Sequence, residues 1–97
     1  MTTEVVFTPS AMRDLARLDR QVYRRVMQAL QRLADTGQGN IARLQGAENE
    51  FRLRVGDWRV RYLLYFIVRQ PEPPATGEEQ VRVIEVLRVL PRGRAYR

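Results

Sequence analysis

The chain has 97 residues, a formal net charge of +6 and an isoelectric point near 11.0, and all 17 of its basic residues are arginine. This length fits one domain, and the positive charge favours a polyanionic partner. Cysteine and histidine are both absent, which excludes disulfides, thiolate nucleophiles and histidine proton shuttles. The 11 acidic residues are scattered rather than clustered, so we expect no metal and no cofactor.

The first third of the sequence predicts a short strand followed by two helices. Residues 5–7 are β-branched and aromatic, as is common in strands. Thr8 and Pro9 fit a helix N-cap and first helical position, and Asp19 fits the cap of a second helix that stops at Gly37. Apolar residues recur every three or four positions along both helices. The second helix has too few turns for a coiled coil, so we interpret its apolar stripe as core-facing.

Residues 51–62, with the sequence FRLRVGDWRVRY, predict a β-hairpin. Two alternating runs flank Gly56 and Asp57, which is the pattern of a type II′ turn. Because side chains alternate between faces along a strand, the apolar residues share one face and the arginines share the other. The arginines then form two cross-strand pairs, Arg52 with Arg61 and Arg54 with Arg59.

These two arginine pairs require an explanation, because like charges directly opposite each other destabilise a sheet by roughly 0.2–1 kcal/mol per pair. One interpretation is a solvated outer face, since an arginine stem covers apolar surface while its head stays in water. The other interpretation is an anion site, which two adjacent like-charge pairs favour. Guanidinium groups match phosphate geometry with a rigid fork of donors, so phosphate is the expected anion.

The last third of the sequence predicts two strands joined by a polar loop. The second hairpin strand continues to Val68 with apolar residues on both faces, as expected of a central, covered strand. Residues 69–80 are polar and rich in proline, and they predict a long loop that is either functional or mobile, with mobile favoured. Residues 81–89 predict the last strand, in which strict alternation places Val86 and Val89 on opposite faces.

The order strand, helix, helix and three strands predicts an α+β fold. We expect two helices packed on one face of a mostly antiparallel four-stranded sheet, with the other face open and carrying the hairpin arginines. The start of the chain has no basic, apolar leader, and the longest apolar run, residues 62–68, is too short to cross a membrane. We therefore expect a cytoplasmic protein with no membrane partner.

Three segments together resemble the RelE/ParE superfamily of bacterial type II toxin–antitoxin systems: SAMRDLARLDRQVYRRVMQALQRL, RLRVGDWRVRY and the ending RVLPRGRAYR. The likeness covers nearly the whole chain, so residues 1–97 are expected to form one toxin domain. The RelE branch cleaves messenger RNA in the ribosomal decoding site, and the ParE branch inhibits DNA gyrase without nuclease chemistry. The full set of basic and aromatic residues favours the RelE branch.

The resemblance implies site residues at the hairpin and at the C-terminus. It assigns catalytic roles to the two basic positions of the first hairpin strand, the arginine after the turn, the arginine ending the last strand and the final tyrosine, which are Arg52, Arg54, Arg59, Arg92 and Tyr96. Three neighbouring arginines are expected to contact RNA: Arg61, Arg88 and Arg94. Two departures are Pro91, where many members have histidine or lysine, and arginine instead of lysine on the hairpin.

The implied reaction is attack of a ribose 2′-hydroxyl on the adjacent phosphate, which leaves a 2′,3′-cyclic phosphate. The nucleophile belongs to the RNA, and a preorganised arginine stabilises the negative charge of the transition state. The general base stays open among Glu48, Glu50 and Tyr96, because arginine remains protonated. The implied partners are a cognate antitoxin and messenger RNA on the ribosome, with DNA gyrase as the alternative target.

Overall fold

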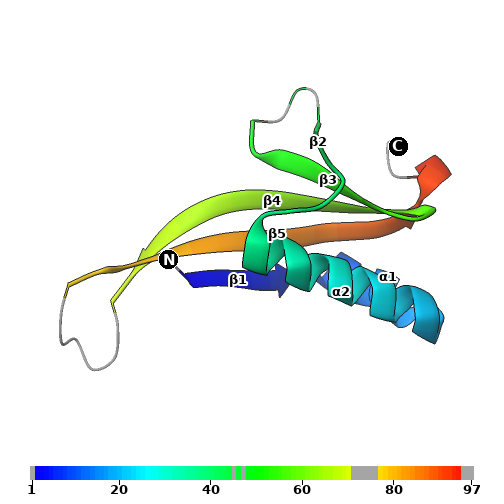
Figure 1. Ribbon diagram of the computed structural model, residues 1–97, viewed down its shortest axis with the longest axis horizontal. Helices are drawn as coiled ribbons and strands as arrows, with labels where there is room; N and C mark the ends of the chain where they lie inside the picture. The colour runs from blue at the N-terminus through cyan, green and yellow to red at the C-terminus, as the bar shows by residue number, and fades with distance from the viewer. Residues whose placement is uncertain (1, 45, 47, 71–76, 95–97) are drawn as a thin grey trace.

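A computed structural model describes residues 2–44, 46, 48–70 and 77–94 of the chain. Within this part the elements run in the order β1 (Thr2–Phe7), α1 (Pro9–Ala16), α2 (Arg20–Thr36), β2 (Ile41–Arg43), β3 (Glu50–Val55), β4 (Trp58–Arg69), β5 (Glu79–Pro91) and the 3₁₀ helix η1 (Arg92–Arg94). Both helices lie on the same side of the sheet (Figure 1). The predicted α+β fold is confirmed.

The sheet has the strand order β1-β5-β4-β3-β2, with β1 parallel to β5 and every other pair antiparallel. The expected four strands are therefore five in the described part of the chain. The additional strand, β2, lies between Gly37 and the hairpin, where no strand was predicted, and it pairs Ile41 with Leu53 and Arg43 with Phe51. Three residues carry too little pattern to indicate a strand, and β2 forms because the backbone edge of β3 is available to it.

The helix termini follow the sequence closely. Thr8 caps α1 by accepting a hydrogen bond from the Ala11 amide at 3.1 Å, and Asp19 caps α2 by accepting one from the Val22 amide at 2.9 Å. Gly37 ends α2 in the left-handed conformation, with φ at 72°. The three predicted helix signals are confirmed.

The core lies between the helices and the sheet. The buried helix residues are Ala11, Leu15, Val26, Leu30 and Leu33, and the buried strand residues of the same cluster are Leu53, Val55, Val60, Tyr62, Ile84, Val86 and Val89. The apolar stripe of α2 thus faces the core, as expected. The helices leave the opposite face of the hairpin uncovered, and this is the face of the arginines.

A bulge in β5 corrects the predicted faces of the last strand. Arg61 pairs with Arg88, but the next residue, Tyr62, pairs with Val86, so Leu87 is an extra residue on β5. The extra residue shifts the alternation by one position. Val86 and Val89 are therefore both in the core, and the prediction that they lie on opposite faces is wrong.

Side chains of the α1 region complete the edge of β5 beyond the end of β1. The Thr8 hydroxyl donates to the Leu87 carbonyl at 2.8 Å. The Asp14 carboxylate accepts from the Val89 amide at 2.9 Å and from Arg88 Nε at 2.8 Å. Edge groups that no strand reaches are thus satisfied by side chains, which holds the bulge in place.

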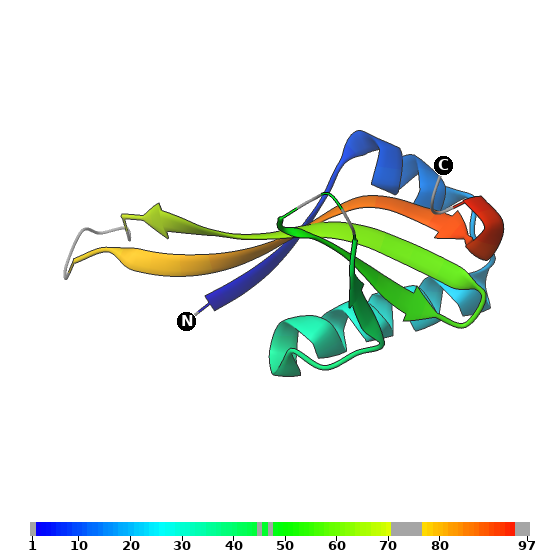
Figure 2. The ribbon, with the colours of Figure 1, turned by 90° about the horizontal axis from the view of Figure 1, so that it is seen from above.

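The outer half of β4 is more exposed than predicted. Phe66, Ile67 and Val68 have exposed fractions of 55%, 39% and 60%. β3 begins only at Glu50, opposite Leu63. Beyond Leu63, β4 therefore continues as an edge strand paired with β5 alone. Figure 2 shows this two-stranded extension reaching beyond both helices. The expectation of a central, covered strand holds only for the first half of β4.

The connection between β4 and β5 is shorter than predicted. Arg69 still belongs to β4 and Glu79 already belongs to β5. Arg69 forms ion pairs with Glu4 at 2.8 Å and with Glu79 at 3.6 Å, which tie the end of this extension to β1. The predicted mobile loop falls largely on residues 71–76, which lie outside the described part of the chain.

The Asp14 carboxylate gives a testable link between pH and stability. Burial alone would raise the pKa of Asp14, but hydrogen bonds from Arg88 and the Val89 amide, with the charges of Arg88 and Arg17, bring it below its ordinary value. A lowered folded-state pKa contributes stability above the unfolded-state pKa of about 3.9, and this contribution is lost as the pH falls through the folded-state value.

We expect Asp14→Asn to lower the free energy of unfolding by about 1–3 kcal/mol at pH 7, because a buried, hydrogen-bonded charge is lost. The gap between variant and wild type should close as the pH falls below 4, where Asp14 itself becomes protonated. Urea unfolding followed by circular dichroism across pH 2.5–7 measures both quantities. A gap of constant size over this range would contradict the assignment.

Candidate nucleic-acid interface

The β3–β4 turn has the predicted register. Val55 pairs with Trp58 across Gly56 and Asp57. Gly56 has φ of 58°, and no described non-glycine residue has a positive φ, which fits a type II′ turn. A Cβ atom on Gly56 would also lie 2.6 Å from Nη2 of Arg25 on α2. The positive φ favours glycine here, and a side chain at this position would also displace the guanidinium group of Arg25.

Arg59 is buried against this turn, with an exposed fraction of 5%. Its Nη1 donates to the carbonyl oxygens of Gly56 and Trp58, each at 2.9 Å. The expectation that Arg59 lies on an open face is therefore wrong. The side chain folds back over the turn and fixes its backbone, and it keeps its charge in a partly desolvated position.

Arg59 is surrounded by positive charge. Burial lowers the pKa of Arg59 below its ordinary value, and the charges of Arg54, Arg52 and Arg92 lower it further, while Asp57 opposes the shift. Within the described residues, Arg59 forms no ion pair. We refer to Arg52, Arg54, Arg59 and Arg92 as the arginine cluster. These are four of the five residues to which the resemblance assigned catalysis.

Arg92 reaches the cluster through the backbone at the end of β5. Pro91 pairs with Trp58, and the Arg92 amide donates to the Asp57 carbonyl at 2.8 Å. The helix η1 thereby lies next to the β3–β4 turn (Figure 1). Arg92 is exposed, as is Arg54 on β3. The cluster thus combines one buried guanidinium group with exposed ones.

Two of the arginines expected to contact RNA are held by carboxylates instead. Arg61 donates from Nε and Nη2 to the same Glu50 oxygen, at 3.0 and 2.7 Å. Arg88 is paired with Asp14. Arg94 lies in η1, but its side chain is outside the described part of the structure, and Tyr96 lies outside it entirely.

Two of the three candidate bases, Glu48 and Glu50, lie in the described part of the chain. Glu50 is engaged by Arg61, and its side chain is 15% exposed. Glu48 is exposed, and its backbone carbonyl accepts a hydrogen bond from Arg43. No group of three His, Cys, Asp or Glu residues in the described ranges is arranged to hold a metal ion. Electrostatic stabilisation is therefore the chemistry that this site offers most clearly.

The sequence pattern missed two arginines that extend the basic surface. Arg25 and Arg32 of α2 line, together with Arg54, a shallow cavity of about 330 Å³ between the helix and β3. Their separation of seven residues places them on one face of the helix, which was the available signal. That this face of α2 lies beside the arginine cluster becomes visible only in the structure, where α2 packs against the hairpin.

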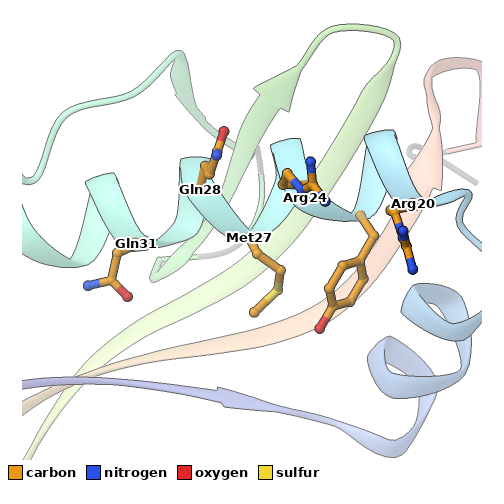
Figure 3. Close-up of a pocket in the computed structure, with 6 residues that line it drawn as sticks. Arg20, Arg24, Met27, Gln28 and Gln31 are labelled. Carbon is orange, nitrogen blue, oxygen red and sulfur yellow. The ribbon is translucent and has the colours of Figure 1, made fainter.

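A wider depression, of about 650 Å³, lies along another side of α2 (Figure 3). It is lined by residues of α2 alone: Arg20, Tyr23, Arg24, Met27, Gln28 and Gln31. No carboxylate lies among these residues, and none of them belongs to the arginine cluster. Within the described residues, neither helix is long and apolar enough to cross a membrane.

Comparison with known proteins identifies the family. Residues 5–96 match a family model described as the ParE toxin of type II toxin–antitoxin systems, parDE. The chain belongs to this toxin family. The resemblance to the RelE/ParE superfamily is therefore confirmed over nearly the entire sequence. None of the curated proteins matches this toxin at a significant level.

Two solved structures share the fold of the toxin. A chain of the archaeal RelE–RelB complex from Pyrococcus horikoshii OT3 is 26% identical, with a TM-score of 0.65, over 98% of this chain and 100% of that chain. A chain of the RelB–RelE antitoxin–toxin complex from Methanococcus jannaschii is 18% identical, with a TM-score of 0.61, over 94% of both chains. The second likeness shows the fold alone.

The contrast between Arg59 and Arg54 predicts opposite effects on the stability of the toxin. We expect Arg59→Ala to lower the free energy of unfolding by about 1–3 kcal/mol, because the turn carbonyls of Gly56 and Trp58 lose their donor. Arg54→Ala, at an exposed position, should change it by less than about 0.5 kcal/mol. Urea unfolding of both variants measures this contrast, and equal effects would contradict a structural role for Arg59.

Proposed function

We propose that this toxin binds messenger RNA at the arginine cluster and cleaves it on the ribosome. The observation that carries the proposal is Arg59: a buried guanidinium group beside three further arginines, with no ion pair in the described part of the chain. Burying the Arg59 charge without an ion-pair partner is unfavourable, and an anion bound beside it removes the penalty. The rigid donor fork of arginine favours phosphate as that anion.

The chemistry follows from the arrangement of the cluster. The RNA supplies the nucleophile, its own 2′-hydroxyl, and the products are a 2′,3′-cyclic phosphate and a 5′-hydroxyl. Nη1 of Arg59 is occupied by the turn carbonyls, while its Nε and Nη2 make no hydrogen bond to another described residue. These donors, with the exposed Arg54 and Arg92, stabilise the charge that develops on the phosphate oxygens.

Dependence on the ribosome follows from the weakness of the candidate bases. Glu50 is neutralised by Arg61, so a free toxin has little means to remove the 2′-hydroxyl proton. A ribosome that bends the message and holds the hydroxyl in line with the phosphorus supplies orientation, which is worth a large part of such a barrier. The toxin then acts in the cytoplasm, where translation takes place.

A cognate antitoxin is the second proposed partner. The family is that of type II toxin–antitoxin systems, and both similar structures are complexes of a toxin with its antitoxin. Inhibition of DNA gyrase is the alternative function, and the match to a family described as ParE favours it. In that case the arginine cluster docks a target and no bond is broken.

A translated reporter separates these functions. We expect wild-type toxin to cut the reporter within its coding region and to spare the same transcript without a start codon. Arg92→Ala should reduce cutting by about 10²–10³-fold, as expected for loss of one transition-state donor. Arg13→Ala is the control and should cut normally, because Arg13 is exposed on α1 and, among the described residues, hydrogen-bonds only to Ser10.

Three outcomes of this experiment contradict the proposal in different ways. Equal cutting of both transcripts would indicate a free ribonuclease. Equal loss of cutting with Arg92→Ala and Arg13→Ala would indicate a bulk charge effect. An uncut reporter accompanied by inhibition of DNA supercoiling would establish the gyrase alternative.

The salt dependence of binding to free RNA tests which arginines contact phosphate. Each phosphate contact that is removed from a single strand lowers the slope of log affinity against log salt by about 0.7. We expect this change for Arg54→Ala and for Arg92→Ala. Arg61→Ala alters net charge equally but removes an arginine that Glu50 already neutralises, so its slope should be unchanged. Fluorescence anisotropy with a short labelled RNA measures all three slopes.

A further inference from the structure

The outer half of β4 presents an unpaired backbone edge. The Leu64 amide donates to the Asn49 carbonyl at 3.0 Å, so it points to the side of β4 on which β3 lies. β3 begins at Glu50, one residue after Asn49. In an antiparallel strand the amide and carbonyl of alternate residues point to the same side. The amide and carbonyl groups of Phe66 and Val68 therefore point to the same side as those of Leu64, where β3 does not extend. Among the described residues, these groups have no backbone partner on that side.

An apolar cavity adjoins this edge on the helix side of the sheet. Its volume is about 240 Å³, and its lining includes Leu33 of α2, Ile41 of β2, and Leu64 and Phe66 of β4. Phe66 and Val68 are on this same side of β4, since their side chains alternate with Ile67. An added strand would thus have backbone groups to pair with and a cavity to receive one of its side chains.

Arg82 is the one charged residue of the cavity lining. It pairs with Phe66 in the β4–β5 register, and its guanidinium carbon lies 5.9 Å from the centre of the Phe66 ring. Arg82 forms no salt bridge to another described residue. A carboxylate from a bound segment would give Arg82 the ion-pair partner that the described part of the toxin does not provide.

We propose that an extended, acidic segment of the antitoxin adds as a strand to the free edge of β4 at Phe66 and Val68. One apolar side chain of the segment fills the cavity and one carboxylate pairs with Arg82. Strand addition of this kind gains affinity from main-chain hydrogen bonds and specificity from alternate side chains. The inference rests on the proposed toxin–antitoxin function and identifies how the partner is recognised.

A second copy of the toxin fits this edge less well. The edge offers the groups of only two outward-facing residues, whereas stable protein interfaces bury roughly 1,200–2,000 Å². Each copy also carries a net charge of +6. A short acidic segment matches both the small size and the positive charge of the surface.

Two variants of one residue separate backbone pairing from side-chain contact. Val68→Pro removes an amide that points away from β5, and an edge strand tolerates this change. We expect Val68→Pro to weaken binding of the small protein encoded beside the toxin gene by about tenfold or more. The variant loses one main-chain hydrogen bond to the partner and disturbs the adjacent one. Val68→Ala keeps the amide and should weaken binding by less than about threefold.

Charge reversal tests the role of Arg82. Arg82→Glu should weaken the same complex by at least about tenfold, because a carboxylate of the partner would meet a like charge. Arg13→Glu makes the same change of net charge on α1 and should leave the affinity near that of the wild type. Amide exchange measured by nuclear magnetic resonance should show Phe66 and Val68 exchanging rapidly in the free toxin and protected in the complex.

Unchanged affinity of Val68→Pro, with both amides still exchanging in the complex, would overturn the inference. Protection of these amides in the toxin alone, with a dimer in sedimentation, would overturn it in favour of a second copy. Val68→Pro should remain as toxic as the wild type in cells that lack the antitoxin. A wild type that neither slows growth nor binds the neighbouring protein would instead refute the proposed function.

Discussion

One nitrogen of Arg59 donates to the carbonyl oxygens of both Gly56 and Trp58, and this interaction holds the β3–β4 turn in a single register. A slip of one residue would move every hairpin arginine to the core face and every apolar residue to solvent. The same turn receives the C-terminal segment, since the Asp57 carbonyl accepts the Arg92 amide. The arginine cluster therefore exists because one buried guanidinium group organises the backbone around it.

The structure divides the arginines near this face into two groups. Arg61 and Arg88 are paired with Glu50 and Asp14, and the second pair also fixes the bulge that sets the faces of β5. Arg54, Arg59 and Arg92 form no salt bridge within the described residues. A face made only of paired arginines would be structural. The arginines without a salt bridge lie near the β3–β4 turn, which supports an anion site there. The ion-paired Arg61 and Arg88 have a structural role.

Local signals in the sequence predicted much of this fold. The caps at Thr8 and Asp19 and the hairpin register depend on residues close in the chain, and all three are confirmed. The bulge at Leu87 is held by contacts with Asp14, a distant residue, so alternation alone misplaced it. The ion pair of Glu50 lies within the hairpin, but alternation does not show which carboxylate an arginine engages. The burial of Arg59 was missed although its partners are local, because a pattern gives the face of a side chain and not the direction in which it folds.

The central claim is that the arginine cluster binds phosphate, and the guanidinium Nε–H resonances of the toxin test it most directly. A short single-stranded RNA is titrated into ¹⁵N-labelled protein, and the resonances are assigned with single Arg→Lys variants. The account predicts that the resonances of Arg54, Arg59 and Arg92 shift together with RNA. Those of Arg61 and Arg88, which are engaged by carboxylates, should stay in place. Equal shifts at all five arginines, or no shift at Arg59, would contradict the account.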